Sequence, residues 1–163
     1  MRYDNGDIEK LIQMVPQKQP FRFIDKITYV DESRIEGFYC LDPGSEFYQG
    51  HFPEYPLTPG VILIEVMAQI GLVAFGLYLL NATADGDALL NKIPVLFSAD
   101  VNFRKQVLPG EHLFVVSEKI LFRHGKLLCK VQLFNNDNAA IKKIDVGQVA
   151  QITTSNAEKL FGC

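Results

Sequence analysis

The amino-acid sequence predicts an α+β protein in which one antiparallel β-sheet wraps around a long apolar helix. Residues 61–80 are apolar except for Glu65, Gln69 and the glycines, which is the composition of a helix buried on most sides. Segments with the alternating apolar pattern of half-buried strands lie before and after this stretch. A sheet packed around such a helix is an economical way to form one hydrophobic core.

Length and composition indicate a single globular domain. The chain has 163 residues, of which 48% are hydrophobic and 21% are charged, so it is long enough to bury a sizeable core. We expect one domain over residues 1–163, with a core at about residues 10–153 and an uninformative tail at residues 154–163.

Charge and cysteine usage exclude several classes of function. The net charge of −3 argues against a nucleic-acid partner, because phosphate binding needs a concentrated basic surface. The scattered residues Cys40, Cys129 and Cys163 fit neither a disulfide framework nor a metal site, which indicates a reducing compartment. The N-terminal residues have no secretory pattern, and we expect a cytoplasmic protein.

A short helix and two strands are predicted before the long helix. Residues 7–14 are amphipathic with helical spacing. Residues 22–30 and 33–41 have strand character and are joined by a turn at Asp31-Glu32. The apolar face of the second strand comprises Ile35, Tyr39 and Leu41.

A polar loop at residues 82–92 and four strands are predicted after the long helix. The turns between these strands are marked by Pro109-Gly110, His124-Gly125 and residues 135–138. The strands themselves are expected at residues 95–103, 112–122, 126–134 and 139–153. We expect consecutive strands to pair as an antiparallel meander.

The helix at residues 61–80 is long enough to cross a membrane, but other features favour a buried core helix. A glutamate in lipid is costly, no Trp or Lys/Arg cluster flanks the segment, and a series of strand-patterned segments follows it. We therefore expect no membrane span.

The start of this helix carries the first chemical signal. Thr58 is a predicted N-cap and Pro59 the first helical residue, where the absence of an N–H costs nothing. The next backbone N–H groups, of Gly60 and Val61, have no acceptor within the helix and lie at its positive end. Gly60 has no side chain to block an approaching group, so this end is suited to an oxygen that becomes negative during a reaction.

Polar side chains form a stripe below that helix end. Glu65 follows Val61 by one turn and Gln69 follows Glu65 by one turn, so Gln69 and Val61 are candidate supporting residues for Glu65. A structural reading remains open, in which Glu65 only bonds Gln69 and His51 is only a turn residue. The convergence of His51, Glu65 and the helix end favours an active site.

These residues resemble the active-site signature of the β-hydroxyacyl-(acyl carrier protein) dehydratases of fatty acid synthesis, in their FabZ-like branch. The resemblance covers most of residues 10–153 and implies the hot-dog fold, a sheet wrapped around a central helix. The signature segments are Gly50-His51-Phe52-Pro53, Pro56, Pro59-Gly60-Val61 and Glu65-Val66-Met67-Ala68-Gln69.

The resemblance implies the dehydration of a 3-hydroxyacyl thioester to a trans-2-enoyl thioester. His51 corresponds to the base that removes the proton next to the thioester carbonyl, and Glu65 to the carboxyl group that helps the 3-hydroxyl leave as water. Gly60 corresponds to the residue whose N–H polarises that carbonyl. The apolar neighbours of Glu65 favour a protonated carboxyl that can act as the acid. We expect no metal and no cofactor, because the sequence has no clustered His/Cys ligands and no dinucleotide-binding turn.

The same resemblance implies partners. The acyl substrate is carried on the phosphopantetheine arm of an acyl carrier protein, and the two catalytic residues of one site come from the two chains of a homodimer. Family members also assemble as hexamers, as trimers of dimers.

The expected acyl-tunnel lining is Phe75, Leu79, Phe97 and Phe103, although such residues are more often plain core. A basic patch for the carrier protein is expected at Arg104, Lys105 and Arg123, each of which alone is more often a solvated strand edge.

Departures from the family pattern leave alternatives open. Glu54 stands where the family usually has glycine, and the segments 82–92 and 135–138 are further sites where substrate access would differ. A hot-dog acyl thioesterase and a non-catalytic acyl-carrier-binding protein are the alternatives. The spacing of His51 and Glu65, with Pro59-Gly60 between them, favours the dehydratase. Acyl chain length, pathway and isomerisation of the enoyl product stay open.

Overall fold

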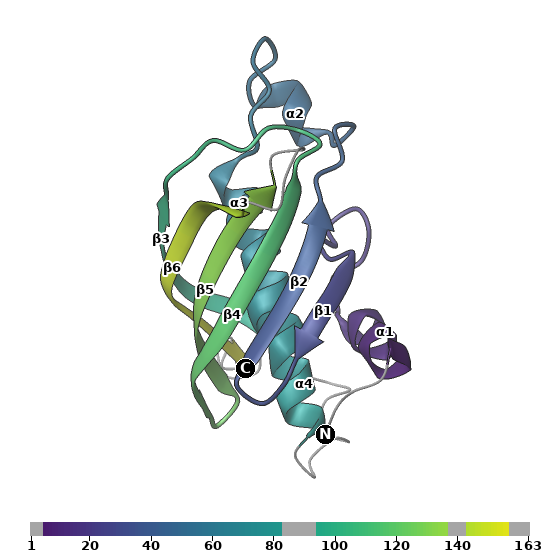
Figure 1. Cartoon of the computed structure of the whole chain (residues 1–163), viewed down its shortest axis with the longest axis vertical. Coiled ribbons are helices and arrows are strands. Elements are labelled where there is room, and N and C mark those ends of the chain that lie inside the picture. The colour runs from purple at the N-terminus through teal and green to yellow at the C-terminus, as the bar shows by residue number, and fades with distance from the viewer. Residues whose placement is uncertain (1–4, 83–93, 137–142, 157–163) are drawn as a thin grey trace, which may run out of the picture.

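The computed structural model describes residues 5–82, 94–136 and 143–156, and it confirms the predicted α+β architecture. A curved six-stranded antiparallel sheet wraps around one long helix (Figure 1). Most of the predicted loop at 82–92, the second half of the turn at 135–138 and most of the tail lie outside the described residues. The predicted single domain stays a prediction.

The described helices and strands agree with the predicted order, with one addition. The short helix α2 was not predicted, because four residues carry no periodic signal. In chain order the elements are α1 (Asn5–Met14), β1 (Lys26–Val30), β2 (Arg34–Cys40), α2 (Phe47–Gly50), α3 (Gly60–Ala68), η1 (Gln69–Ala74), α4 (Phe75–Asn81), β3 (Pro94–Phe103), β4 (His112–Arg123), β5 (Lys126–Asn136) and β6 (Lys143–Asn156).

Strand β1 begins later than its sequence pattern predicts. The pattern places a strand over residues 22–30, whereas the structure starts it at Lys26. The preceding backbone has another partner, because the Phe23 N–H and the Phe21 carbonyl both bond the side chain of Gln69 in the central helix. In this segment, hydrogen bonds to the Gln69 side chain take the place of hydrogen bonds to a neighbouring strand.

The strand order corrects the predicted meander. The sheet runs β1-β2-β4-β5-β6-β3, so β3 pairs antiparallel with β6 instead of its sequence neighbours. β3 lies at the edge of the sheet, and the loop after Phe103 leads from it to β4 past the start of α3 (Figure 1). This loop is attached there, because the Thr58 N–H donates to the Val107 carbonyl at 2.9 Å. β3 is consequently an edge strand.

The central helix contains a π-helical segment that the sequence did not predict. Gly60–Asn81 is continuous, but residues Gln69–Ala74 have π geometry between α3 and α4. Within this segment the Gly71 carbonyl accepts a hydrogen bond from the buried Ser117 hydroxyl of β4 at 2.8 Å. A side chain that bonds a helix carbonyl in this way is a recognised cause of local departure from α geometry.

The helix lies in the hydrophobic core, as predicted. By length and composition alone it is apolar enough to cross a membrane, yet 67% of its most apolar window is buried by the fold. The sheet covers it with inward-facing side chains from β2, β4 and β5. Those with no exposed surface are Ile35, Leu113, Val115, Leu127, Cys129, Val131 and Leu133.

Candidate active site

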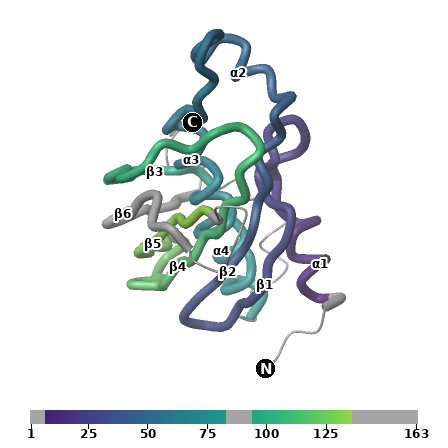
Figure 2. Tube along the Cα trace, turned by 45° about the horizontal axis from the view of Figure 1, so that its top comes forward, coloured from purple at the N-terminus to yellow at the C-terminus, as the bar shows by residue number. Residues whose placement is uncertain are grey.

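His51 lies between α2 and α3, in a loop that projects with α2 beyond the end of the sheet (Figure 1, Figure 2). Its Nδ1 is 2.9 Å from the Leu57 carbonyl oxygen. A carbonyl only accepts hydrogen bonds, so this contact assigns the ring proton to Nδ1. When the ring is neutral, the other nitrogen, Nε2, carries the lone pair that a base needs.

The loop that carries His51 is closed by further hydrogen bonds. The Leu57 N–H donates to the His51 carbonyl at 3.1 Å, so the two residues are joined by backbone and by side chain. A third bond joins the Tyr48 and Thr58 hydroxyls at 2.7 Å, and both residues are buried. Burial raises the pKa of Tyr48, so its hydroxyl is neutral at pH 7.

Helix α3 begins one residue later than predicted. Pro59 is the N-cap, and its carbonyl accepts the first intrahelical bonds, from Ile62 at 3.0 Å and Leu63 at 3.2 Å. The N–H groups of Gly60 and Val61 therefore precede the hydrogen-bond ladder at the positive end of the helix. Thr58, the predicted N-cap, uses its hydroxyl for Tyr48 instead.

Gly60 packs against an aromatic ring from the edge strand. A Cβ at this position would lie 3.0 Å from Cε2 of Phe103. The absence of a side chain therefore serves packing at this helix start, in addition to the open approach to the N–H that the sequence suggested.

Gln69 connects Glu65 to the segment before β1. Its Nε2 donates to Glu65 Oε1 at 2.7 Å and to the Phe21 carbonyl at 2.8 Å. Its Oε1 accepts from the Phe23 N–H at 2.7 Å. Gln69 has no exposed surface, and these three bonds satisfy both ends of its amide. Glu65 Oε1 is held in place by them, which leaves Oε2 for other partners.

Within one chain the predicted acid and base are held separately. Among the described residues, His51 bonds Leu57 and Glu65 bonds Gln69, and no hydrogen bond joins His51 to Glu65. Glu65 is only partly buried, and Val61 one turn before it is 72% exposed. Within a single chain Glu65 is therefore only partly enclosed, and the protonated carboxyl expected for it stays a prediction.

The four predicted tunnel-lining residues divide into two pairs. Phe75 and Leu79 are buried in the core, with 0% and 5% of their surface exposed. Phe97 and Phe103 lie on edge strand β3 and are 63% and 40% exposed. One pair therefore belongs to the interior of the chain and the other to its surface.

The three predicted basic residues do not form one patch. Arg104 and Lys105 are exposed and directly follow β3, beside Phe103 at the helix entrance. Arg123 ends β4. The strand pairings place Phe103 opposite Gly147, Gly147 opposite Leu133, and Leu133 opposite Val115. Val115 and Arg123 are eight residues apart on β4, which at the usual rise per residue is about 26 Å along the strand.

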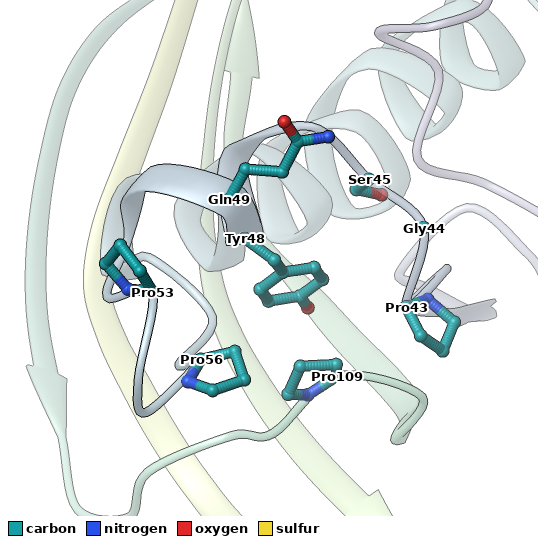
Figure 3. A pocket seen from close by; sticks show the side chains of 8 residues that line it. All are labelled: Pro43, Gly44, Ser45, Tyr48, Gln49, Pro53, Pro56 and Pro109. Atoms are coloured by element: carbon teal, nitrogen blue, oxygen red, sulfur yellow. The ribbon is translucent and has the colours of Figure 1, made fainter.

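A pocket of about 370 Å³ lies beside the His51 loop. Figure 3 shows the Tyr48 ring in its middle, with Pro56 and Pro109 next to it. Neither His51 nor Glu65 lines this pocket. Its lining comprises Pro43, Gly44, Ser45, Tyr48, Gln49, Pro53, Pro56 and Pro109.

The arrangement is suited to removing a proton next to a carbonyl. A ring nitrogen can act as a base, two backbone N–H groups at a helix start can stabilise a developing oxyanion, and a carboxyl group with one fixed oxygen can exchange a proton.

A family model described as a FabA-like domain matches residues 15–143. The chain belongs to the FabA-like family. This FabA-like protein is 35% identical over 121 residues to the 3-hydroxyacyl-(acyl-carrier-protein) dehydratase FabZ of Acinetobacter baylyi. The aligned region covers 73% of the chain and 78% of that relative. It is 32% identical over 143 residues to the enzyme of the same name from Bacillus subtilis, covering 78% of the chain and 94% of the relative.

Solved structures confirm the hot-dog fold of this FabA-like protein. The dehydratase heterocomplex ApeI:P from Xenorhabdus doucetiae has a TM-score of 0.67 at 13% identity, covering 99% of the chain and 97% of that one. A thioesterase from Haemophilus influenzae has a TM-score of 0.57 at 16% identity, covering 91% and 90%. At these identities the likeness concerns the fold alone.

Sequence reasoning missed three contributors to the site. The Leu57 carbonyl, the hydrogen bond between Tyr48 and Thr58, and the attachment of Gln69 to the backbone of Phe21 and Phe23 were not predicted. Each joins groups through tertiary structure or through the main chain. Side-chain spacing, the signal that pairs Glu65 with Gln69, does not report such contacts.

Proposed function

We propose that this FabA-like protein is a 3-hydroxyacyl-(acyl carrier protein) dehydratase of fatty acid or related acyl-chain biosynthesis. The observation that carries the proposal is the tautomer of His51, whose Nδ1–H donates to Leu57 and leaves Nε2 as a base. The FabZ dehydratases that the chain resembles over more than two thirds of its length support the same reaction.

The proposed reaction is an elimination of water. His51 Nε2 takes the proton from the carbon next to the thioester carbonyl, while the N–H of Gly60, with that of Val61, stabilises the oxygen of the enolate-like intermediate. The bond between carbon 3 and its hydroxyl breaks, and the hydroxyl leaves as water with the proton of the Glu65 carboxyl. The products are the trans-2-enoyl thioester and water, and transfer of the proton from His51 back to Glu65 restores the enzyme.

The protein acts as a homodimer in which His51 of one chain and Glu65 of the other form each site. Two observations support this part of the proposal. The two side chains share no hydrogen bond within the chain, and Glu65 lies below the exposed Val61. Edge strand β3 carries exposed apolar residues, and such an edge is a template for pairing with another chain. Further assembly as a trimer of dimers is part of the same proposal.

The substrate is an acyl chain on the phosphopantetheine arm of an acyl carrier protein in the cytoplasm. Arg104 and Lys105 lie beside the helix entrance and are the basic contacts proposed for the acidic carrier protein. Arg123 is too far along the sheet to join them in one contact. Phe97 and Phe103, exposed in one chain, are the residues proposed to line the acyl path once a partner covers β3.

One assay tests the proposed activity against its alternatives. The protein is incubated with a 3-hydroxyacyl carrier protein, and the products are separated and identified by mass. Formation of an enoyl product supports the proposal. This product is about 18 Da lighter than the substrate, because one water molecule is lost. Free 3-hydroxy acid shows a thioesterase instead, and binding without conversion shows an inactive carrier-binding protein. His51→Ala is the matched control and is expected to abolish enoyl formation.

A further inference from the structure

A buried polar pair lies behind the candidate base and has no part in the proposed chemistry. The Tyr48 hydroxyl of α2 and the Thr58 hydroxyl, just before α3, are 2.7 Å apart. Their residues are 6% and 4% exposed, so neither hydroxyl can exchange its partner for bulk water without opening the loop. A buried hydrogen bond of this kind is costly to leave half-made.

This hydrogen bond spans the base of the loop that carries His51. Inside the loop, Leu57 binds His51 twice, by accepting from Nδ1 and by donating its own N–H. Thr58 follows Leu57 directly. Its side chain is bound to α2, and its backbone N–H is bound to the Val107 carbonyl of the loop between β3 and β4. Thr58 is therefore fixed from two directions.

We propose that the Tyr48–Thr58 hydrogen bond sets the position of His51 relative to the Gly60 N–H, and that Tyr48 and Thr58 are positioning residues. Thr58 lies one residue after the carbonyl that orients His51 and two residues before Gly60. A shift of this peptide therefore moves the base and the oxyanion donor relative to each other. This inference rests on the proposed dehydratase function.

A merely structural role predicts a different pattern of mutant effects. Removing one hydroxyl leaves the other buried without a partner and destabilises the fold, whereas replacing both with apolar groups of similar shape is nearly neutral for stability. If the pair only stabilises the protein, the double variant regains activity together with stability. If the pair positions the base, stability returns and the turnover rate stays low.

The test uses Tyr48→Phe, Thr58→Val and the double variant, measured by steady-state kinetics and thermal unfolding. In each single variant we expect kcat to fall by about 10- to 100-fold, the loss typical of a misplaced catalytic group, with KM within about twofold. In the double variant we expect the melting temperature to recover towards that of the wild type and kcat to remain low. The effects of the two substitutions on kcat are then not additive.

Tyr55→Phe is the matched control in the same loop. The Tyr55 hydroxyl has a long bond of 3.4 Å to Gln106 at the exposed surface, and its loss should change neither kcat nor stability. A second readout follows the His51 ring in the substrate-free protein. Nitrogen–proton NMR correlations report which ring nitrogen carries the proton, and we expect the wild-type Nδ1–H signal to shift or mix with the other tautomer in Tyr48→Phe.

Three results would overturn the inference: wild-type kcat in both single variants, recovery of kcat in the double variant, or an unchanged His51 NMR signature in Tyr48→Phe. Failure of the proposed function is distinguishable, because it appears as a wild-type protein that forms no enoyl product. The NMR comparison needs no turnover and still decides whether the Tyr48–Thr58 bond positions His51.

Discussion

At the scale of single residues, the candidate site depends on which hydrogen bonds its polar groups make. The proposed role of His51 as a base depends on one backbone carbonyl, because that acceptor fixes a proton on Nδ1. Glu65 is oriented by Gln69, which donates a hydrogen bond to Oε1. The amide of Gln69 is itself fixed by two backbone groups before β1. The orientations of the His51 and Gln69 side chains are thus set by hydrogen bonds to backbone groups.

Replacing Gln69 with leucine tests this control. Gln69→Leu keeps the volume but leaves the buried Phe23 N–H, the part-buried Phe21 carbonyl and Glu65 without their partner. We expect the free energy of unfolding, measured by urea denaturation, to fall by about 3 kcal/mol. We expect kcat to fall by about tenfold or more as Glu65 loses its fixed orientation. The control Gln13→Leu, at an exposed position of α1, should stay within about 0.5 kcal/mol of the wild type.

At the scale of elements, the central helix combines local and long-range determinants. Its apolar sequence favours a buried helix, and that much is visible in residues 61–80. The π segment follows instead from contact with β4, where the Ser117 hydroxyl bonds the Gly71 carbonyl. A Cβ at Gly71 would lie 3.0 Å from Cβ of Ser117 and 3.1 Å from Cγ1 of Val131. Helix and sheet therefore come into close contact at a position where a glycine permits it.

Two glycines in this helix give a matched pair of substitutions. Gly71→Ala inserts a methyl group into that close contact, and we expect a loss of about 1–3 kcal/mol in the free energy of unfolding. Gly76→Ala adds a methyl group whose nearest neighbour is Cδ2 of Leu127 at an ordinary 3.7 Å, so we expect no loss and a gain of up to about 1 kcal/mol from helix propensity. Urea unfolding compares them, and equal stabilities would refute the close-packing explanation.

At the scale of the whole molecule, one chain holds His51 and Glu65 by separate hydrogen bonds and has an uncovered sheet edge at β3. The start of α3 packs against β3, where Gly60 meets Phe103, and Val61 and Phe97 are largely exposed. Glu65 is partly open there, and its hydrogen bonds do not include His51. A second copy that pairs along β3 would cover apolar surface and bring a further set of catalytic groups to each entrance.

Mixing two inactive variants tests whether the site is shared. His51→Ala and Glu65→Ala are each expected to be inactive. After subunit exchange, half of the dimers are mixed and each mixed dimer has one intact site, so activity should reach about a quarter of the wild-type value. Exchange is verified by mass spectrometry of differently tagged chains, and exchange without any recovery of activity would refute the shared site.

A charged residue on the edge strand tests the pairing itself. Phe97→Lys places a charge on an exposed edge position, which opposes strand pairing between chains. We expect light scattering after size exclusion to show monomers with little activity. Leu121→Lys is the control, because Leu121 is 52% exposed on β4 away from this edge and should leave the dimer intact. A dimeric Phe97→Lys protein would contradict pairing through β3.

The sequence by itself determined the fold class, the buried helix and the inward face of β2. It also placed His51, the helix start and Glu65 in the order that the family signature implies. These features were accessible because apolar periodicity and helix-end chemistry depend on residues a few positions apart. The start of α3 was predicted to within one residue for the same reason.

Only the tertiary structure decided which distant groups meet. Gln69 bonds backbone groups 46 and 48 residues away, Thr58 bonds Tyr48 across a loop, and β3 pairs with β6 rather than with its sequence neighbours. No periodic pattern encodes such contacts, because hydrogen-bond partners in a closed core are selected by how the sheet curves around the helix. The sequence thus specifies the proposed catalytic groups, and the tertiary structure determines which partners hold each of them.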